Sequence, residues 1–313
     1  MKTVATFLIL AFLSAVCVGA PDNSALLFRS GFEPGTNIKI IDNQKAGKLD
    51  VAYLIGADVE SDYDWDKLNE VIGIKDRMTF EFWGTHRGVD ADLKIVDDPD
   101  RSRGKVLYSE YLSNSESGIY KGVTSLTQAS LKLDSNFKQL GVRYKIKISE
   151  AYNALLAPEF ALDSNADFGW WLISEMWTLR HQDGTAGSQP IYLRKSEKGF
   201  TFSAVMRYRD GHAHPVVWTV DNNDFTLPIG KWIEIVHFVR VGKAGEARLY
   251  FSVDGVVVFD IQDKDIEWKG MDWRSWSCMK AYQNQEITNF LRERGTPSET
   301  WYDDFEIWSG IPK

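Results

Sequence analysis

Cysteine is scarce in this sequence, and the motifs of several large enzyme classes are missing. The only two cysteines are Cys17 and Cys278. Cys17 lies in an N-terminal apolar run, so the chain beyond that run cannot form an internal disulfide. There is no Gly-x-Ser-x-Gly elbow, phosphate-binding loop or His-Glu-x-x-His pair. These absences argue against serine hydrolases of the elbow type, P-loop nucleotide enzymes and zincins.

Long hydrophobic runs are also missing after residue 20. The one apolar run, at 7–18, follows the positive charge of Lys2 and precedes the small residues Gly19 and Ala20. It is too short to span a bilayer comfortably, so we interpret residues 1–20 as a cleaved signal peptide. A lipid anchor on Cys17 is a weaker alternative, because bulky Val16 precedes that cysteine. We therefore expect a secreted or periplasmic product without a membrane-spanning segment.

Positive charge does not dominate the chain, whose formal net charge is -8. A net acidic protein is a poor candidate for broad binding to nucleic acid or anionic membranes, although a local basic groove is compatible with it. Aromatic residues are abundant, with 12 Trp, 12 Tyr and 17 Phe. Flat aromatic faces serve both protein cores and sugar-binding clefts, so this count permits carbohydrate binding without requiring it.

Repeats and linkers are absent as well, and strand signals recur along the whole chain. Alternation is clear at 143–148, where basic and apolar side chains take opposite faces. Asp254-Gly255 stands between two apolar runs and predicts a tight hairpin. We predict short helices at 65–71, 150–156 and 286–294. The predicted strands are 26–32, 79–83, 105–112, 142–148, 169–181, 190–193, 200–209, 215–220, 232–241, 247–253, 256–261, 279–282 and 301–308.

This pattern predicts an all-β domain over residues 21–313, built as a two-sheet jelly roll with a few short helices. Further segments of the mature chain stand out: Gly31-Phe32-Glu33, 98–107, 231–236, 247–255 and 301–308. Together they resemble the concanavalin-A-like lectin/glucanase folds, and most of all the polysaccharide lyases of the heparinase and alginate-lyase types. They cover the mature chain loosely and concern the scaffold.

The resemblance implies a lyase that cleaves an acidic, uronate-containing polysaccharide by β-elimination. Similar lyases take catalytic residues from a mid-chain strand carrying His and a late strand carrying Lys and Tyr. Here the first strand offers Glu175, Trp177 and His181, and the second offers Lys280, Tyr282 and Asn284. The late strand departs from the family pattern, since its Tyr follows Lys by two residues and the intervening Gly is absent.

The faces of these two strands follow from alternation. With period two, one face carries Trp171, Ile173, Glu175, Trp177, Leu179 and His181, and another carries Lys280, Tyr282 and Asn284. We predict catalytic roles for Glu175, His181, Lys280 and Tyr282, and substrate contacts for Trp177 and Asn284. The alternative is structural: the indoles belong to the core, His181 ends its strand at solvent, and Tyr282 is a buried tyrosine.

A second hairpin suggests an anion site independently of the resemblance. A two-residue turn at Asp210-Gly211 pairs Arg209 with His212 and Arg207 with His214. We predict that these four residues bind substrate carboxylate or sulfate groups. A solvated hairpin tip with neutral histidines is the alternative.

No cofactor is required for this chemistry, but a structural Ca²⁺ is possible. Folds of this type often bridge the first and last strands with calcium through oxygen ligands. Here Glu33, Asp303 and Asp304 are the residues that could supply them. Zinc is disfavoured, because Cys278 is alone and His212-x-His214 lacks a third ligand.

Two other functions remain open. A non-catalytic, lectin-like protein would bind glycans through aromatic contacts without needing His181 or Tyr282. A glycoside hydrolase needs two carboxylates facing one cleft, and Glu175 has no partner acid on its own strand. The partner predicted in every case is a carbohydrate, preferably an acidic polysaccharide, and not a nucleic acid or a membrane.

Overall fold

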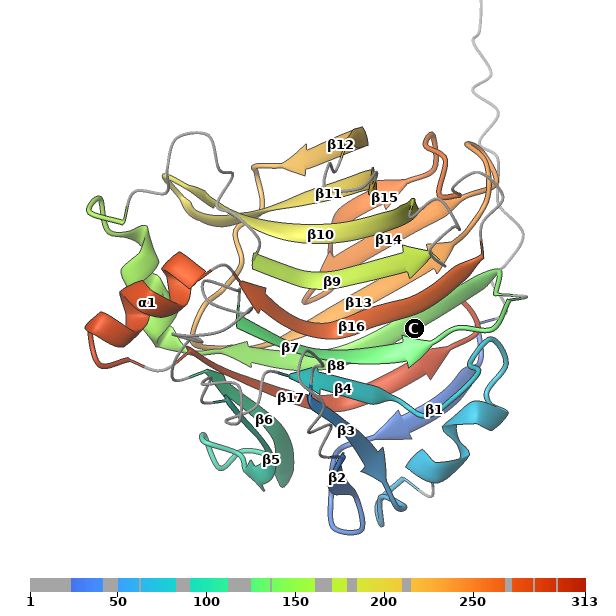
Figure 1. Ribbon diagram of the computed structural model, residues 1–313, viewed down its shortest axis with the longest axis horizontal. Coiled ribbons are helices and arrows are strands. Elements are labelled where there is room, and N and C mark those ends of the chain that lie inside the picture. The colour runs from blue at the N-terminus through green and yellow to red at the C-terminus, as the bar shows by residue number, and fades with distance from the viewer. Residues whose placement is uncertain are drawn as a thin grey trace, which may run out of the picture.

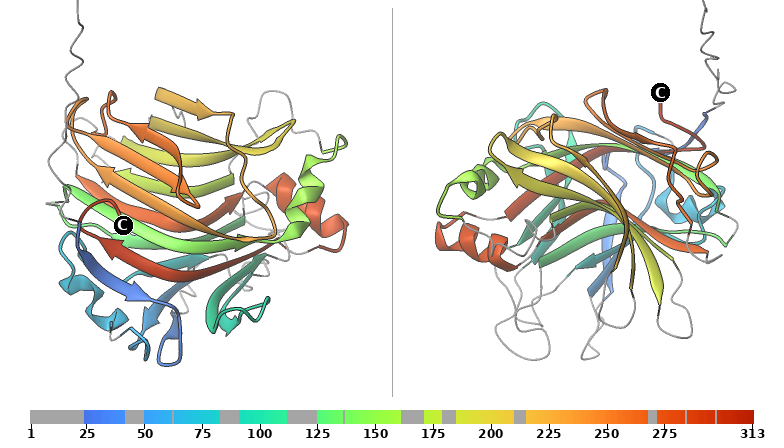
Figure 2. Two further views of the ribbon diagram at one scale, coloured as in Figure 1. Left: turned by 180° about the vertical axis from the view of Figure 1, so that it is seen from behind. Right: turned by 90° about the horizontal axis from the view of Figure 1, so that it is seen from above.

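The computed structural model describes the chain from residue 24 onward in segments, and two curved antiparallel sheets contain most of them (Figures 1 and 2). The signal peptide predicted at 1–20 lies outside the described residues. No helix within the described part of the chain is both long and apolar enough to cross a membrane. The described segments are 24–41, 50–61, 63–82, 91–111, 125–135, 137–160, 171–178, 185–209, 215–267, 272–283, 285–296 and 298–313.

The first sheet has eight strands, and its order does not follow the chain. Strand β17 lies in its middle and joins the end of the chain to the start, because β1 pairs with it. The order is β15 (Val256–Ile261), β14 (Arg248–Val253), β13 (Trp232–Arg240), β8 (Gln139–Ile148), β17 (Ser298–Trp308), β6 (Lys105–Tyr111) and β5 (Ala91–Asp97), with β1 (Leu26–Ser30) beside β17.

The second sheet has nine strands and packs against the first. Its centre brings together the middle and the end of the chain, since β9 lies beside β16. The order is β12 (Val216–Asn222), β11 (Gly199–Arg209), β10 (Ala186–Ser196), β9 (Trp171–Thr178), β16 (Trp273–Gln283), β7 (Ser125–Lys132), β4 (Thr79–Phe82), β3 (Asp50–Ile55) and β2 (Asn37–Ile41).

This architecture confirms the predicted all-β, two-sheet jelly roll. The helices are short, as expected: η1 (Trp65–Glu70), η4 (Glu150–Leu156) and α1 (Gln285–Glu293). The hairpin at Asp254-Gly255 is also confirmed, because Val253 pairs with Val256 and both turn residues have positive φ (48° and 76°). Each predicted strand overlaps an observed one. The sequence pattern does not predict β2, β3, β5 and β7.

The core fills the space between the two sheets. Phe202 of β11 meets Phe251 of β14 with ring centroids 5.5 Å apart. The Tyr144 hydroxyl donates across the core to the carbonyl of Cys278, at 2.8 Å. Each sheet therefore has an inner face in this core and an outer face turned away from the partner sheet. The outer face of the nine-stranded sheet carries the candidate site.

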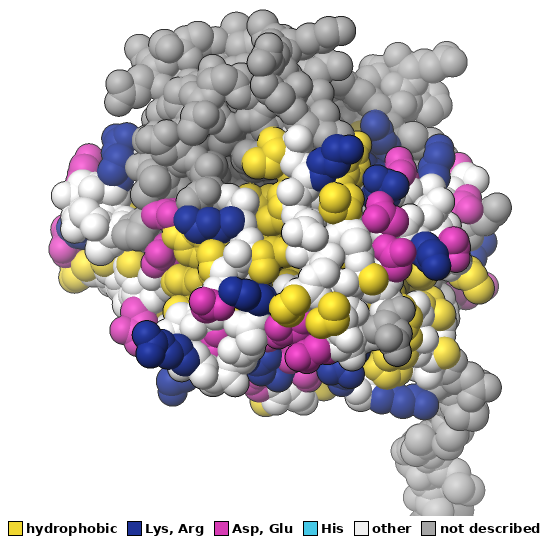
Figure 3. Space-filling model, turned by 90° about the horizontal axis from the view of Figure 1, so that it is seen from below, with side chains coloured by type: hydrophobic (Ala, Val, Ile, Leu, Met, Phe, Trp, Pro, Cys, Tyr) yellow, Lys and Arg dark blue, Asp and Glu magenta, His cyan; other side chains and the backbone are white. Residues whose placement is uncertain are grey.

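The end of the sandwich formed by β2 and β5 has a surface on which apolar and charged side chains are mixed. Seen from below, it shows hydrophobic side chains between charged ones of both signs (Figure 3). A groove of about 480 Å³ between these edge strands is lined by Ile38, Ile40, Leu93 and Ile95, among others. Ile40 is 58% exposed. Glu33, a predicted calcium ligand, is among the residues that line this groove.

Candidate functional site

A bulge in β9 decides which side chains reach the outer face. Both Ile173 and Ser174 lie on the core side, and the pairing of β9 with β10 shifts register at this point. Glu175 and Trp177 therefore point to the outer face, whereas Trp171 stacks in the core on Tyr152 at 4.5 Å. The predicted common face for all of these residues is wrong, because strict alternation does not survive the extra residue.

Glu175 is the centre of a buried ion cluster on this face. Its Oε2 accepts a hydrogen bond from Lys280 Nζ on β16, and its Oε1 accepts from Arg207 Nη2 on β11 at 3.1 Å. Glu175 is 1% exposed and Lys280 2% exposed. Arg207 Nε also donates to the hydroxyl of Ser188, at 3.1 Å. Three predicted site residues from distant parts of the sequence are thus in contact, because Lys280 and Arg207 both bind the carboxylate of Glu175.

The electrostatics of the cluster keep this carboxylate ionised. Burial by itself raises the pKa of Glu175, but the charges of Lys280 and Arg207 and a side-chain hydrogen bond from Trp177 oppose it, and the pKa lies below its ordinary value. A carboxyl group whose pKa is lowered in this way is ionised near neutral pH and is a poor proton donor there. It can hold two cations in place, which is the role that its contacts favour.

Two tyrosines flank the cluster. Tyr192 of β10 and Tyr282 of β16 both pair with Leu172, so they lie on either side of β9. Arg207 lies over the Tyr192 ring, 5.5 Å from its centroid, and Lys280 Nζ lies 4.8 Å from the centroid of Tyr282. With strands about 5 Å apart, the two tyrosine backbones are separated by roughly 10 Å. We call these two tyrosines with Glu175, Lys280 and Arg207 the Glu175 centre.

Tyr192 is not among the predicted site residues. A signal for it was present, because Ile191 and Leu193 alternate with it and face the core. Alternation therefore assigns Tyr192 to the outer face. What the sequence does not reveal is that β10 lies between β9 and β11, which brings this ring beside Arg207.

The predicted partner of Arg207 across the second hairpin is wrong. Val216, and not His214, pairs with Arg207, and the β11–β12 register shifts between Met206 and Arg207. Pro215, whose carbonyl accepts from the Tyr208 amide at 3.0 Å, precedes the strand. Strand β12 therefore begins later than a two-residue turn requires. Arg209 ends β11 opposite Ala186.

Several predicted site residues have no described position. His181, His212, His214 and Asn284 all lie outside the described residues. Their predicted roles remain predictions.

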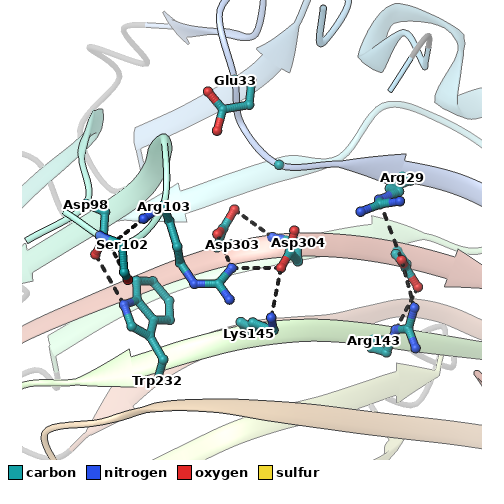
Figure 4. Close-up of polar contacts among 12 residues, drawn as sticks. Arg29, Glu33, Asp98, Ser102, Arg103, Arg143, Lys145, Trp232, Asp303 and Asp304 are labelled. Carbon is teal, nitrogen blue, oxygen red and sulfur yellow. Dashed lines mark hydrogen bonds and ion pairs between the residues drawn. The ribbon is translucent and has the colours of Figure 1, made fainter. Parts of the chain in front are cut away.

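The predicted calcium ligands lie on the other side of the molecule, around the last strand (Figure 4). Asp304 has a positive φ of 49°, which turns its carboxylate and that of Asp303 toward the same partner. Arg103 Nη1 donates to Asp303 Oδ2 at 2.6 Å and to Asp304 Oδ2 at 2.7 Å. Lys145 Nζ lies 3.2 Å from Asp304 Oδ2.

Glu33 does not join these two carboxylates. Its Oε1 accepts from the backbone amide of Lys105 at 3.1 Å. Burial, with the nearby charges of Glu60 and Asp58, raises its pKa despite that bond. Burial likewise raises the pKa of Asp303 to about 6, against the hydrogen bond from Arg103.

These residues, as placed, do not fit a bound calcium. Among the described residues, no group of three or more His, Cys, Asp or Glu side chains is arranged to hold a metal ion. A guanidinium occupies the position between Asp303 and Asp304 that a cation needs. The positive charge here comes from Arg103 and Lys145, and the Arg103 guanidinium also lies 5.3 Å from the centroid of the Trp232 ring.

The similarities of this chain to known proteins are structural and weak. No protein-family model and no curated protein sequence matches this chain. The endo-β-1,4-glucuronan lyase of the fungus Trichoderma reesei aligns at 11% identity over 72% of this chain and 89% of that one, with a TM-score of 0.46. Alginate lyase Aly36B aligns at 10% identity, 72% and 84% coverage, and a TM-score of 0.44.

A further similar structure is the PL-14 alginate lyase of Aplysia kurodai. It aligns at 12% identity over 72% of this chain and 88% of that one, with a TM-score of 0.42. Identities and scores this low do not bear on the activity of the present chain.

Proposed function

We propose that this chain is an exported polysaccharide lyase that cleaves an acidic, uronate-containing polysaccharide by β-elimination. The observation that supports it is the Glu175 centre, in which one buried carboxylate holds Lys280 and Arg207 between two tyrosines. Elimination needs a cationic group to neutralise the uronate carboxylate, a base and an acid. The centre contains side chains suited to each role.

Arg207 and Lys280 are proposed to receive the uronate carboxylate. Both are cations that Glu175 holds on the outer sheet face, where a uronate carboxylate can pair with them. Neutralising that carboxylate makes the hydrogen on the neighbouring ring carbon, C5, easier to remove as a proton. Because the cations are fixed by Glu175 before the substrate arrives, little reorganisation is needed when charge develops.

The tyrosines are proposed to act in the two proton transfers of the elimination. A base, either the Tyr282 phenolate or His181, removes the C5 proton, and the electron pair of that bond forms the C4–C5 double bond. The C4–O bond to the next sugar breaks, and an acid, Tyr282 or Tyr192, protonates the departing oxygen. The products are an unsaturated uronate and a new chain end, so no water is consumed.

The contacts of Glu175 disfavour the hydrolase alternative. A glycosidase needs one protonated and one ionised carboxyl group across the scissile bond. Here the charged side chains that contact Glu175 within the described chain are both cations. Its lowered pKa opposes the role of general acid.

The remaining predicted residues extend this proposal. Trp177 is proposed to contact sugar rings beside Glu175. Arg209, His212, His214 and Asn284 are proposed to bind further acidic groups of the polymer.

The test is an incubation of the mature protein, residues 21–313, with alginate, glucuronan, heparin and a neutral β-glucan. We expect ultraviolet absorbance from unsaturated uronate with at least one of the first three, and none with the neutral glucan. Reducing ends without this absorbance would indicate a hydrolase. Retardation in an affinity gel without any product would indicate a lectin-like protein. Either result refutes the proposal.

Amino-acid substitutions test whether the Glu175 centre carries the lyase activity. Lys280→Met is expected to lower kcat/KM at least a hundredfold, whereas Lys138→Met, at an exposed position outside the Glu175 centre, leaves it unchanged. Tyr282→Phe tests the proton step, with a loss of about 10²–10⁴-fold in kcat expected for a general acid or base. Export is tested separately by N-terminal sequencing of protein recovered outside the cytoplasm, with Pro21 expected as the first residue.

A further inference from the structure

The Glu175 centre depends on an irregularity in two adjacent strands. In β9, the consecutive residues Ile173 and Ser174 both lie on the core side. In β16, the consecutive residues Cys278 and Met279 both belong to the core, and the pairing with β7 shifts register between Ser277 and Met279. Glu175 follows the first irregularity directly, and Lys280 follows the second. Without these extra residues, alternation would send the two charged side chains to the core.

Ser174 is an unusual residue for the inner side of such a bulge. It is fully buried, and its hydroxyl accepts a hydrogen bond from Trp276 Nε1 at 3.0 Å. The same hydroxyl bonds to Nδ1 of His237, also at 3.0 Å. His237 belongs to β13 of the opposite sheet. The hydroxyl therefore ties the β9 bulge both to β16 and to the partner sheet.

The imidazole of His237 packs against two aromatic rings. Its ring meets Trp276 edge to face at 4.9 Å and Phe251 at 5.5 Å. Among the described residues, Nε2 of His237 is buried without a hydrogen-bond partner, so the bond of Nδ1 to Ser174 is the one that orients the ring. Burial lowers the pKa of His237 to about 3, so it is neutral wherever the protein is folded near neutral pH.

We propose that Ser174 is a positioning residue: its hydroxyl, bonded to Trp276 and His237, fixes the β9 bulge so that Glu175 faces Lys280 and Arg207. Ser174 itself is enclosed in the core and cannot reach a substrate. Its effect on catalysis, which rests on the proposed lyase function, passes through Glu175. Its effect on the geometry of the Glu175 centre does not depend on that function.

Packing alone does not account for a serine at this position. Alanine fills nearly the same space and has no hydroxyl to satisfy, so a purely structural role predicts little change for Ser174→Ala beyond altered stability. The positioning role predicts a change in the contacts of Glu175. Ser252→Ala, at a buried serine of β14 in the opposite sheet, serves as the matched control.

The deciding experiment is the crystal structure of Ser174→Ala together with its kinetics. We expect Glu175 to lose contact with Lys280, Arg207 or both, and kcat on the cleaved polymer to fall at least tenfold. Ser252→Ala should retain both the contacts and the rate. If Ser174→Ala keeps both contacts of Glu175 and the wild-type kcat, the proposal is overturned.

A second pair of variants covers the case in which Ser174→Ala does not fold. His237→Asn retains an amide near the position of Nδ1, so the contacts of Glu175 should persist, whereas His237→Leu removes the bond and should disturb them. Equal contacts in the two variants would also overturn the proposal. If the wild-type protein cleaves no uronate polymer, the lyase function fails, and these structures still decide whether Ser174 positions Glu175.

Discussion

Neutralising Glu175 should destabilise the protein strongly, because it leaves two cations together in a buried place. Glu175 is 1% exposed and Lys280 2% exposed, while the Arg207 side chain is 16% exposed. Glu175→Gln keeps the shape of the side chain and removes the charge that holds both partners. Breaking a buried ion pair by removing one member costs about 3–5 kcal/mol. For a chain of this size, roughly 2 °C per kcal/mol gives a fall in Tm of about 6–10 °C.

The assay is thermal unfolding at neutral pH, with Glu246→Gln as the control. Glu246 is exposed, so its neutralisation should change the free energy of unfolding by no more than about 0.5 kcal/mol. The double variant Glu175→Gln/Lys280→Met replaces the Glu175–Lys280 pair with neutral side chains and should recover most of the lost stability. A Tm for Glu175→Gln within about 2 °C of the wild type, or a double variant less stable than Glu175→Gln, would refute this reasoning.

The other predictions concern pH, charge and space. The folded-state pKa of Glu175 lies below its ordinary value of 4.5, so ionised Glu175 stabilises the fold above pH 4.5, and this stabilisation is lost as the pH falls further. Acid unfolding of the wild type and of Glu175→Gln measures the difference. Arg103→Gln should lower Tm by about 4 °C, from a loss of about 2 kcal/mol. Wild-type Tm should be the same in EDTA and in CaCl₂, since Arg103 supplies the positive charge. Gly141→Ala places Cβ 2.2 Å from the backbone oxygen of Gly310 and should cost about 1–3 kcal/mol, whereas Gly31→Ala, with its nearest contact at 3.6 Å, should cost less; chemical denaturation measures both.

The parts of the fold that could be predicted are those that a few neighbouring residues specify by themselves. Asp254-Gly255 specifies a tight turn because both residues tolerate positive φ, and the observed register is the one that such a turn imposes. Strand β7 (Ser125–Lys132) gives no comparable signal, since its serine, glutamine and alanine are weak strand formers. It is a strand because β4 and β16 lie on either side of it. Such partners come from distant sequence, and a local pattern does not contain them.

The candidate site was predictable in its members but not in their orientation. Glu175 and Lys280 are visible as polar residues within apolar strands, yet they are 105 residues apart and meet only because β9 and β16 are neighbours. The bulge at Ser174 carries no local signature, because a serine between apolar residues equally suggests an outward side chain. Arg207 was selected for a hairpin partner that it does not have, and it belongs to the centre through the strand order instead.

The two charge clusters of the molecule differ in the sign of the charges that they gather. Around the last strand, Asp303 and Asp304 bring negative charges together, and Arg103 and Lys145 satisfy them within the protein. At the Glu175 centre, one carboxylate joins the cations Lys280 and Arg207. A buried ion pair is weak evidence for stability, because well-packed apolar residues can often replace it without loss. Two cations on an outer sheet face, between two tyrosines, therefore support the proposed binding of an anionic substrate.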